Sequence, residues 1–439
     1  MILTYIFHSG FCLEMEHSIL VFDCWLDPAE VMPQKLQIQK PMYVFSSHFH
    51  EDHFTKDIFS WKSFKSDITY ILSKDILKHR RAKKEDADAW LAKGAVWQDE
   101  HLKVTATGSN DSGVSWIVET EGRTIFHAGD LNNWYARFLT DDYQGGNIIS
   151  QEFGEVNPGR EEKLLLGELK DIQKITNHFD LVMFPVDGRI GNGYTRGARQ
   201  FIERFKVGLL VPMHFAASGF ESAWRMMEFT KPAHIPFWCI SERGESIECH
   251  PLQPFLPRNG KILFLGSFPP QKKRWSCIFF YPNFINDHWR LEGEIFYGDR
   301  QHFVDEAHKC FKLSEIQAHC QEKGIAFFDT ATAVRRLKDN ASDKFLEVVV
   351  PTEIEGLIQQ MPVCRAIIVT GEKAAQTVCE TLGIDQCPAV GQAVQIPGLY
   401  NQKGQLIELY RLPSSSRAYP LAFVKKTDAY RQMFQCYLA

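Results

Sequence analysis

The sequence lacks the features that mark a membrane-bound, secreted or disordered chain. No apolar run among its 439 residues approaches the ~20 residues that a membrane-spanning helix needs. The first residues, Met1 to Phe7, contain no basic residue and no small-residue cleavage site, so they are typical of a first strand and not of a secretory signal. No internal repeat and no low-complexity tract is evident. The apolar fraction of 44% and the charged fraction of 23% are those of a soluble globular protein.

The cysteines do not form a disulfide framework. There are 11 of them, scattered along the chain, and no two form a Cys-x-x-Cys pair. An odd number without regular spacing favours reduced thiols in a cytoplasmic enzyme.

The net charge of −5 is distributed unevenly. Residues 258–439 contain 22 Lys and Arg against 19 Asp and Glu, whereas residues 1–257 contain 27 against 35. The mildly basic second half is compatible with a phosphate-rich partner such as DNA, and ordinary surface variation explains it equally well.

The length predicts about two or three domains. A segment from His250 to Gly260 contains three prolines and ends in Asn-Gly, so it cannot continue a helix or a central strand. We therefore predict a first domain over residues 1–250, a linker over 251–260 and a second domain over 261–439.

Both predicted domains belong to the α/β class. In the first, apolar runs predict strands at 3–7, 18–22, 42–45, 69–71, 102–106, 114–119, 124–127, 181–185 and 209–212, with helices at 54–64 and 195–205. In the second, strands at 262–265, 325–328, 366–369 and 406–409 are each followed by small or polar residues, and a helix is expected at 370–382. Strands that alternate with helices imply a mostly parallel sheet, whose ligand cleft lies beyond the carboxyl ends of the strands.

A dense cluster of metal-binding side chains follows the strand at 42–45. The run from His48 to His53 contains three imidazoles and the carboxylate of Asp52 within six residues. Imidazole and carboxylate bind zinc and its first-row neighbours. In an extended loop His48 and His50 can hold one ion, while Asp52 and His53 can reach a second.

Later strand ends offer further ligands. Asp130 follows the strand at 124–127 and a glycine, and His214 follows the strand at 209–212. A carboxylate such as Asp130 can bridge two cations. His127 is interpreted as a packing residue or as one that supports a ligand, and Asp187 as a polar group of the pocket.

This pattern resembles the metallo-β-lactamase fold superfamily over nearly all of residues 1–250. The resemblance includes His8-Ser-Gly-Phe11 and Asp23. It implies an αββα sandwich that holds two divalent metal ions. Zinc is the expected metal, and manganese and iron are the alternatives. The ligands that the resemblance implies are His48, His50, Asp52, His53, Asp130 and His214, with Asp130 as the bridge and Asp52 also among the catalytic residues.

The sequence departs from the family at one ligand. Much of the family supplies another histidine between the first motif and the Gly-Asp pair, whereas the equivalent stretch here, residues 107–113, contains none. Asp111 either substitutes as a ligand or forms a turn before Gly113. Two bound cations would lower the pKa of a bound water toward ~7, so hydrolysis is the expected reaction.

The second domain contains a candidate base-binding loop. A glycine turn, Gly266-Ser267-Phe-Pro269, is followed by an aromatic and amide-rich run that contains Asn286 and Trp289. An aromatic wall and an amide can stack a planar base and hydrogen-bond its edge, although a loop that packs on the sheet would look similar.

Together with the late Leu412-Pro-Ser-Ser-Ser416, these motifs resemble the uracil-DNA glycosylase superfamily over residues 260–437, especially its hypoxanthine-DNA glycosylase-like branch. The resemblance implies a three-layer α/β/α domain that excises a damaged base from DNA, with Asn286 positioning the attacking water. The residues that it implies for contact with the base or DNA are Gly266, Ser267, Pro269, Trp289, Leu412, Pro413, Ser414 and Ser416.

Departures from the branch leave its specificity open. His288, Arg417 and Tyr419 stand where the branch commonly has an aromatic residue, Pro and Asn. The sequence therefore predicts a metal-dependent hydrolase fused to a DNA glycosylase-like domain. The alternative is a small-molecule ester or lactone hydrolase whose second domain binds nucleic acid or nucleotide without cleaving it.

Overall fold

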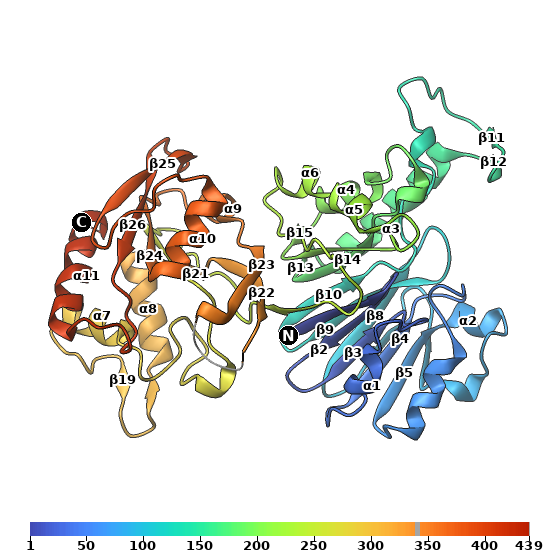
Figure 1. The fold of residues 1–439 in the computed structure, drawn as a ribbon. Helices are drawn as coiled ribbons and strands as arrows, with labels where there is room; N and C mark the ends of the chain where they lie inside the picture. Colours follow the sequence, from blue (N-terminus) through green and yellow to red (C-terminus); the bar gives the residue numbers. More distant parts are fainter. Residues whose placement is uncertain (339–342, 439) are drawn as a thin grey trace. The chain divides into compact units, whose positions relative to one another are not determined.

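The computed structural model describes residues 1–338 and 343–438. The chain forms two compact units, Met1–Ile247 and Glu248–Ala439, and each is described by itself (Figure 1). Each unit combines β-sheets with helices, which confirms the predicted α/β class.

The first unit contains two large sheets and two pairs of short strands, β11-β12 and β13-β15. Strands β1 to β6 follow one another in the first sheet, and the second sheet has the order β16-β14-β10-β9-β8-β7. The bounds of the first set are Ile2–Phe7 (β1), Gly10–Glu14 (β2), Ile19–Phe22 (β3), Met42–Ser46 (β4), Ile68–Ser73 (β5) and Ala89–Leu91 (β6). Those of the second are Val96–Gln98 (β7), Leu102–Gly108 (β8), Val114–Thr120 (β9), Arg123–His127 (β10), Leu181–Pro185 (β14) and Leu210–Met213 (β16).

The two sheets pack face to face through aromatic side chains. Phe22 of β3 stacks on His127 of β10 with ring centroids 5.1 Å apart, and the rings of Phe45 and Trp116 lie 5.7 Å apart. Helices cover the outer faces: α2 (Lys74–Lys78) packs on β5, whereas α3 (Pro158–Gln173) and α4 (Arg196–Ile202) pack on the other sheet. The result is the αββα arrangement that the sequence predicts.

The helical segments differ in detail from the prediction. The predicted helix at 54–64 is a 3-10 helix, Lys56–Ser63, and the one at 195–205 is the shorter α4. The long helix α3 was not among the predicted elements, although Asn157 accepts a hydrogen bond from the backbone of Arg160 and Pro158 occupies the first turn. Both are start signals that the sequence contains.

Short elements complete the first unit. They are α1 (Val31–Lys35), α5 (Phe220–Trp224), α6 (Met227–Thr230), β11 (Ile148–Ser150), β12 (Gly154–Val156), β13 (His178–Phe179) and β15 (Lys206–Val207). Strand β17 (Ser246–Cys249) carries the chain into the second unit.

The second unit has a mostly parallel sheet of order β21-β18-β24-β26-β25. Only the edge strand β25 pairs antiparallel to its neighbour. The bounds are Ile262–Gly266 (β18), Ile325–Asp329 (β21), Ala366–Thr370 (β24), Ala393–Tyr400 (β25) and Leu406–Leu412 (β26). Figure 1 shows α7, α8 and α11 on one side of this sheet and α9 and α10 on the other. The helices are His288–Tyr297 (α7), Leu313–Lys323 (α8), Ile354–Gln359 (α9), Glu372–Leu382 (α10) and Phe423–Leu438 (α11).

Two hairpins lie outside this sheet. Strands β22 (Ala331–Arg336) and β23 (Leu346–Pro351) pair with each other, and β22 also pairs with Glu248 and Cys249 of β17. Strands β19 (Val304–Asp305) and β20 (Cys310–Phe311) form the second hairpin.

Two whole-chain expectations can be compared with the structure. Cys379 and Cys387 are joined by a disulfide, so the expectation of reduced thiols is wrong for this pair. Among residues 1–338 and 343–438, no helix is long and apolar enough to cross a membrane.

Candidate metal centre

The candidate ligands of the first unit stand where strands end. His8 follows β1, the His48–His53 loop follows β4, Asp130 follows β10, and His214 follows β16. Because β10, β14 and β16 are parallel, their carboxyl ends meet at one edge of their sheet. A hydrogen bond of 3.1 Å from the backbone N–H of His214 to the carbonyl of His8 joins the two sheets at this edge.

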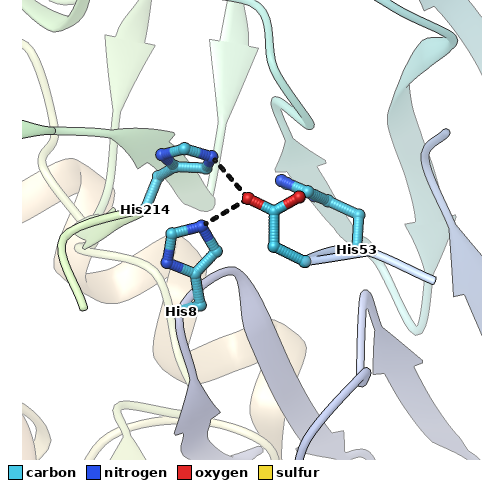
Figure 2. Close-up of side chains that lie close together, drawn as sticks. His8, His53 and His214 are labelled. Atoms are coloured by element: carbon cyan, nitrogen blue, oxygen red, sulfur yellow. Dashed lines mark ion pairs between the residues drawn. The ribbon is translucent and has the colours of Figure 1, made fainter. Parts of the chain in front are cut away.

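The side chains form two adjoining groups of metal-binding atoms. One group consists of His48, His50 and Asp130; the other consists of His8, Asp52, His53 and His214. Within each group, the ligand atoms all lie within 4.8 Å of one another. Figure 2 shows the side chains of His8, His53 and His214 facing a common space.

Asp130 joins the two groups through its two carboxylate oxygens. Oδ2 lies 3.1 Å from His48 Nε2 and 3.9 Å from His50 Nδ1. Oδ1 lies 3.0 Å from His53 Nε2 and 3.4 Å from His214 Nε2. Each oxygen thus faces one group, which is the arrangement of a carboxylate that bridges two cations.

Four buried polar atoms at this point have no hydrogen-bond partner. They are His8 Nε2, His53 Nε2, Asp130 Oδ1 and His214 Nε2. The distances between them are short, but the directions are not those of hydrogen bonds. Buried polar atoms are rarely left unsatisfied, because each costs ~1–3 kcal/mol. Nitrogen and carboxylate oxygen that converge without satisfying one another fit a divalent cation as the missing partner.

A carboxylate holds the Nδ1 atom of His53, and another holds that of His214. Asp23 Oδ2 lies 2.7 Å from His53 Nδ1, and Ser47 donates to the same carboxylate through its backbone N–H and its hydroxyl. Asp187 Oδ2 lies 2.9 Å from His214 Nδ1 and is also held by Arg189. Such partners fix the ring so that Nε2 faces the metal.

The electrostatics of the site favour cations. Burial alone would raise the pKa of the Asp130 carboxyl, but the imidazoles of His53, His48 and His214 hold it well below its usual range. Burial also opposes ionisation of Asp52, yet the contact with His8 Nε2, 3.3 Å from Asp52 Oδ2, lowers its pKa. Both carboxylates are therefore ionised at neutral pH, as metal ligands must be.

The structure brings together His48, His50, Asp52, His53, Asp130 and His214, whereas Asp111 is a member of neither group, although its carboxyl lies near enough to Asp130 and His50 to affect their charges. Asp111 lies in an exposed bend, its backbone N–H bonded to Ser109 Oγ at 3.2 Å. The bend follows from Gly113, whose positive φ and close approach to the Ser47 carbonyl leave no room for a side chain. Of the two interpretations of Asp111, this placement favours the turn-forming residue.

Sequence reasoning did not assign His8 as a ligand. Its signal was present, since His8 is a polar residue at the end of an apolar strand and is followed by Ser9 and Gly10. His8 adopts φ 55°, and burial lowers its pKa to about 4. His127 is fully buried, bonded to the Ser9 carbonyl, and lies outside both groups, where it supports the packing beneath the site.

The centre opens to solvent on one side. The side chains of His50 and Asp52 are 40% and 37% exposed, whereas those of His8, His48, His53, Asp130 and His214 are at most 7% exposed. Trp134 borders the site, with its ring 5.1 Å from that of His214. Substrate must therefore approach past His50 and Asp52.

In the second unit, the predicted motifs gather at the carboxyl edge of the parallel sheet. Gly266 ends β18 and Leu412 ends β26, and the Ser415 carbonyl accepts a hydrogen bond of 3.1 Å from the backbone of Asp287, next to Asn286. Asn286 Oδ1 accepts from the backbone N–H of His288 at 2.9 Å, which fixes its amide at the start of α7. Ser267 is half-buried and Pro269 is buried.

Besides Pro269, three residues proposed for base or DNA contact are buried inside the unit. Trp289 is fully buried and donates its indole N–H to the Phe280 carbonyl at 3.1 Å, because it lies on the core face of α7. Leu412 and Pro413 are also buried. The side chains of Trp289 and Leu412 thus pack in the core of the second unit in this structure, and their contact with a base or DNA stays a prediction. Ser414 and Ser416 are half-buried and accept hydrogen bonds within their own loop.

Asp287, next to Asn286, is a buried carboxylate that the sequence analysis did not single out. Its carboxylate is buried and lies 3.0 Å from Arg417 Nε, 3.5 Å from Lys426 Nζ and 3.8 Å from an Arg300 guanidinium nitrogen. It therefore fastens the late serine loop to the segment that carries Asn286.

Comparison with known proteins finds likeness in structure only. No protein-family model and no curated protein matches the chain. The metallo hydrolase Igni18 from Ignicoccus hospitalis is 16% identical, with a TM-score of 0.39 over 56% of this chain and 96% of its own. The metallo-β-lactamase fold protein YhfI from Bacillus subtilis is 14% identical, with a TM-score of 0.35 over 56% of this chain and 97% of its own.

A third neighbour is a Methanosarcina acetivorans protein named as a uracil DNA glycosylase. It is 22% identical, with a TM-score of 0.29 over 43% of this chain and 98% of its own. Structural neighbours of the chain thus include metallo-β-lactamase fold hydrolases and a glycosylase-like protein. Because these TM-scores are low, we argue the function from the positions of the side chains and not from these neighbours.

Proposed function

We propose that the first unit is a hydrolase that binds two divalent metal ions. The observation that carries this proposal is the convergence of four buried, unpartnered atoms, from His8, His53, Asp130 and His214, between two groups of ligands. His48, His50 and one oxygen of Asp130 would hold one ion. His8, Asp52, His53, His214 and the other oxygen of Asp130 would surround the second.

The metal ions would supply an activated water at neutral pH and polarise the substrate oxygen. The protein's own residues do the rest. Asp23 and Asp187 keep the imidazoles of His53 and His214 oriented. Asp52, the partly exposed member of the second group, would accept the proton of the attacking water and return it to the leaving group. Zinc fits this donor set best, and manganese or iron is compatible with it.

Elemental analysis and a hydrolysis assay test this proposal together. Purified full-length protein should contain zinc, manganese or iron and hydrolyse bis(4-nitrophenyl) phosphate or 4-nitrophenyl acetate. The Asp130→Asn variant should lose both bound metal and turnover. The control variant Asp141→Asn, which changes an exposed residue, should keep both. Wild-type protein that stays metal-free and inactive after addition of each of these metals would overturn the proposal.

For the second unit, we propose a DNA glycosylase-like activity on a damaged base such as uracil or hypoxanthine. The meeting of the Asn286 segment with the serine loop at the carboxyl edge of a parallel sheet supports it. Asn286 would position the water, and the backbone at Gly266 and Ser267 would contact the base or a phosphate. The cations around Asp287 lie beside this loop and would favour a DNA backbone.

Alkali treatment of DNA duplexes that contain uracil or hypoxanthine tests this second activity. Strand breaks that depend on the protein and disappear in Asn286→Ala support excision. Binding without breaks on either lesion would favour the alternative, in which the second unit only binds nucleic acid or nucleotide. In that case hydrolysis of a small ester or lactone by the first unit becomes the main activity.

A further inference from the structure

A groove in the first unit begins at the open side of the metal centre. Its volume is about 580 Å³. Glu51, which lies between the two exposed candidate ligands His50 and Asp52 in the sequence, lines it. The other charged lining residues are Asp57, Lys56, Arg80 and Arg81, and the apolar ones include Trp25 and Leu26. A substrate that approaches the centre past His50 and Asp52 therefore enters beside this groove.

The wall of the groove that carries Arg80 and Arg81 is strongly basic. Residues 74–84 contain six Lys and Arg against one Asp, although the first unit as a whole has 27 against 34. Three acids follow. Glu85 is exposed, Asp86 accepts from the backbone N–H of Lys83 at 2.7 Å, and Asp88 accepts from that of Tyr70 at 2.8 Å. Arg81 forms an exposed ion pair with Glu51 at 3.3 Å, and such pairs contribute little.

Arg80 stands where a glycine would be favoured. It adopts φ 58° just after helix α2, and the backbone N–H of Arg81 closes the helix end by bonding to the Ile76 carbonyl at 2.9 Å. A left-handed residue at this position is usually glycine, so an arginine here carries a conformational cost. A cation that contacts the substrate gives a reason for that cost.

The basic segment is attached to the metal-binding loop. The ring of His79 stacks on that of Phe49, with centroids 3.8 Å apart and planes 12° apart. Phe49 lies between His48 and His50 in the sequence, so Arg80 and Arg81 are held at a fixed place relative to the ligands. Trp25 also lines the groove and offers an aromatic side chain, and its neighbour Leu26 is 48% exposed.

From these observations we propose that the groove binds the phosphate backbone of single-stranded nucleic acid and leads it to the metal centre. Cations and an aromatic side chain that line one groove are the elements with which proteins hold a single strand, since phosphates meet the cations and a base stacks on the ring. This inference rests on the proposed hydrolase and names its substrate class as a polynucleotide phosphodiester.

Photo-crosslinking locates the strand on the full-length protein. The probe is a single-stranded DNA of about 12 nucleotides that carries 4-thiothymidine, and cross-linked peptides are identified by mass spectrometry. Peptides that include Trp25, residues 49–57 or residues 74–84 are expected. Cross-links confined to residues 248–438 would overturn the proposal, as would groove-dependent binding to anionic lipid vesicles in place of the oligonucleotide.

Oligonucleotide binding by a variant that lacks the three groove cations provides the second test. Lys56→Gln/Arg80→Gln/Arg81→Gln should weaken oligonucleotide binding at least tenfold and lower the slope of log K against log [salt] by about 2, at ~0.7 for each of three phosphate contacts. The matched control Lys163→Gln/Lys170→Gln/Lys206→Gln removes three cations elsewhere on the unit and should change neither. Equal effects of the two variants would contradict the groove.

Binding separates this inference from the proposed hydrolysis. Asp130→Asn protein should still cross-link through the groove, because the groove cations do not depend on Asp130. Groove cross-links in a protein that cleaves nothing would defeat the hydrolase and leave the groove proposal standing. Cleavage of bis(4-nitrophenyl) phosphate without groove cross-links would support the hydrolase and contradict the groove proposal.

Discussion

Single residues at the metal centre have separable roles. His8 and Asp52 belong to one group of ligands, His48 and His50 belong to the other, and Asp130 is shared. Replacing His8 by alanine should therefore lower the bound metal from about two ions toward one. Elemental analysis after dialysis checks this, with His17→Ala, an exposed histidine, as the control. A content unchanged from wild type would show that His8 is not a ligand.

Asp23 acts on the metal through His53. It is fully buried, and its carboxylate holds His53 Nδ1 at 2.7 Å. Asp23→Asn should lower metal affinity by about 10- to 100-fold, the usual effect of removing such a partner. Competition with a chelator measures this affinity. Asp67→Asn, at an exposed position, should leave it unchanged, and an equal effect in both variants would refute the role given to Asp23.

Gly266 is required because a carboxylate occupies the space of a side chain. A Cβ atom built there would lie 2.3 Å from Asp329 Oδ1. Gly266→Ala should therefore destabilise the second unit by about 1–3 kcal/mol, as overpacking does. Gly167 on helix α3 has no atom near its Cβ position, so Gly167→Ala should be neutral or stabilising. Urea denaturation compares the two, and equal midpoints would contradict the close contact.

At the scale of elements, helices α7 and α8 are joined by a buried charge. Glu292 of α7 is fully buried, with its carboxylate oxygens 2.9 Å from His288 Nε2 and 2.9 Å from His319 Nε2 of α8. Burial opposes its ionisation, but the hydrogen bonds from the two imidazoles lower its pKa to about 2, from a model-compound value of 4.5. The carboxylate is thus ionised wherever the protein is folded at ordinary pH.

The pH dependence of stability follows from this depressed pKa. Because the folded pKa lies below the unfolded one, Glu292 stabilises the fold fully above about pH 4.5, and this stabilisation is lost as the pH falls toward 2. Glu292→Gln should cost about 3–5 kcal/mol at pH 7 and flatten the acid side of the curve. Glu294→Gln on the same helix should do neither. Denaturation midpoints from pH 3 to 7 that match wild type in both variants would contradict this role.

Strands and candidate ligands could be predicted from the sequence where an apolar run is followed directly by polar residues. The ends of β4, β10 and β16 identify the ligands from His48 to His214, since a polar residue directly after a buried strand lies at a sheet edge. The positions of two side chains, Trp289 and Asp111, could not be predicted in this way. Whether Trp289 faces the core or the cleft depends on the rotation of α7, and the place of Asp111 depends on the close approach of Gly113 to Ser47. Both are consequences of tertiary packing.

At the scale of the whole chain, the two proposed activities should be independent. The metal ligands lie within residues 1–247 and Asn286 lies within the second unit. Asp130→Asn should abolish metal-dependent hydrolysis and leave base excision unchanged, whereas Asn286→Ala should do the opposite. Parallel assays of both variants on the same preparations check this, and loss of both activities in either variant would indicate a single shared site.

The claim on which the account depends is that Asp130 bridges two metal ions. Anomalous X-ray diffraction from crystals of the zinc-loaded protein tests it most directly. We expect two peaks, one on each side of the Asp130 carboxylate and each ~2.0–2.2 Å from one of its oxygens. The absence of any peak near Asp130, with zinc bound only elsewhere, would contradict the metal centre and the hydrolase built on it.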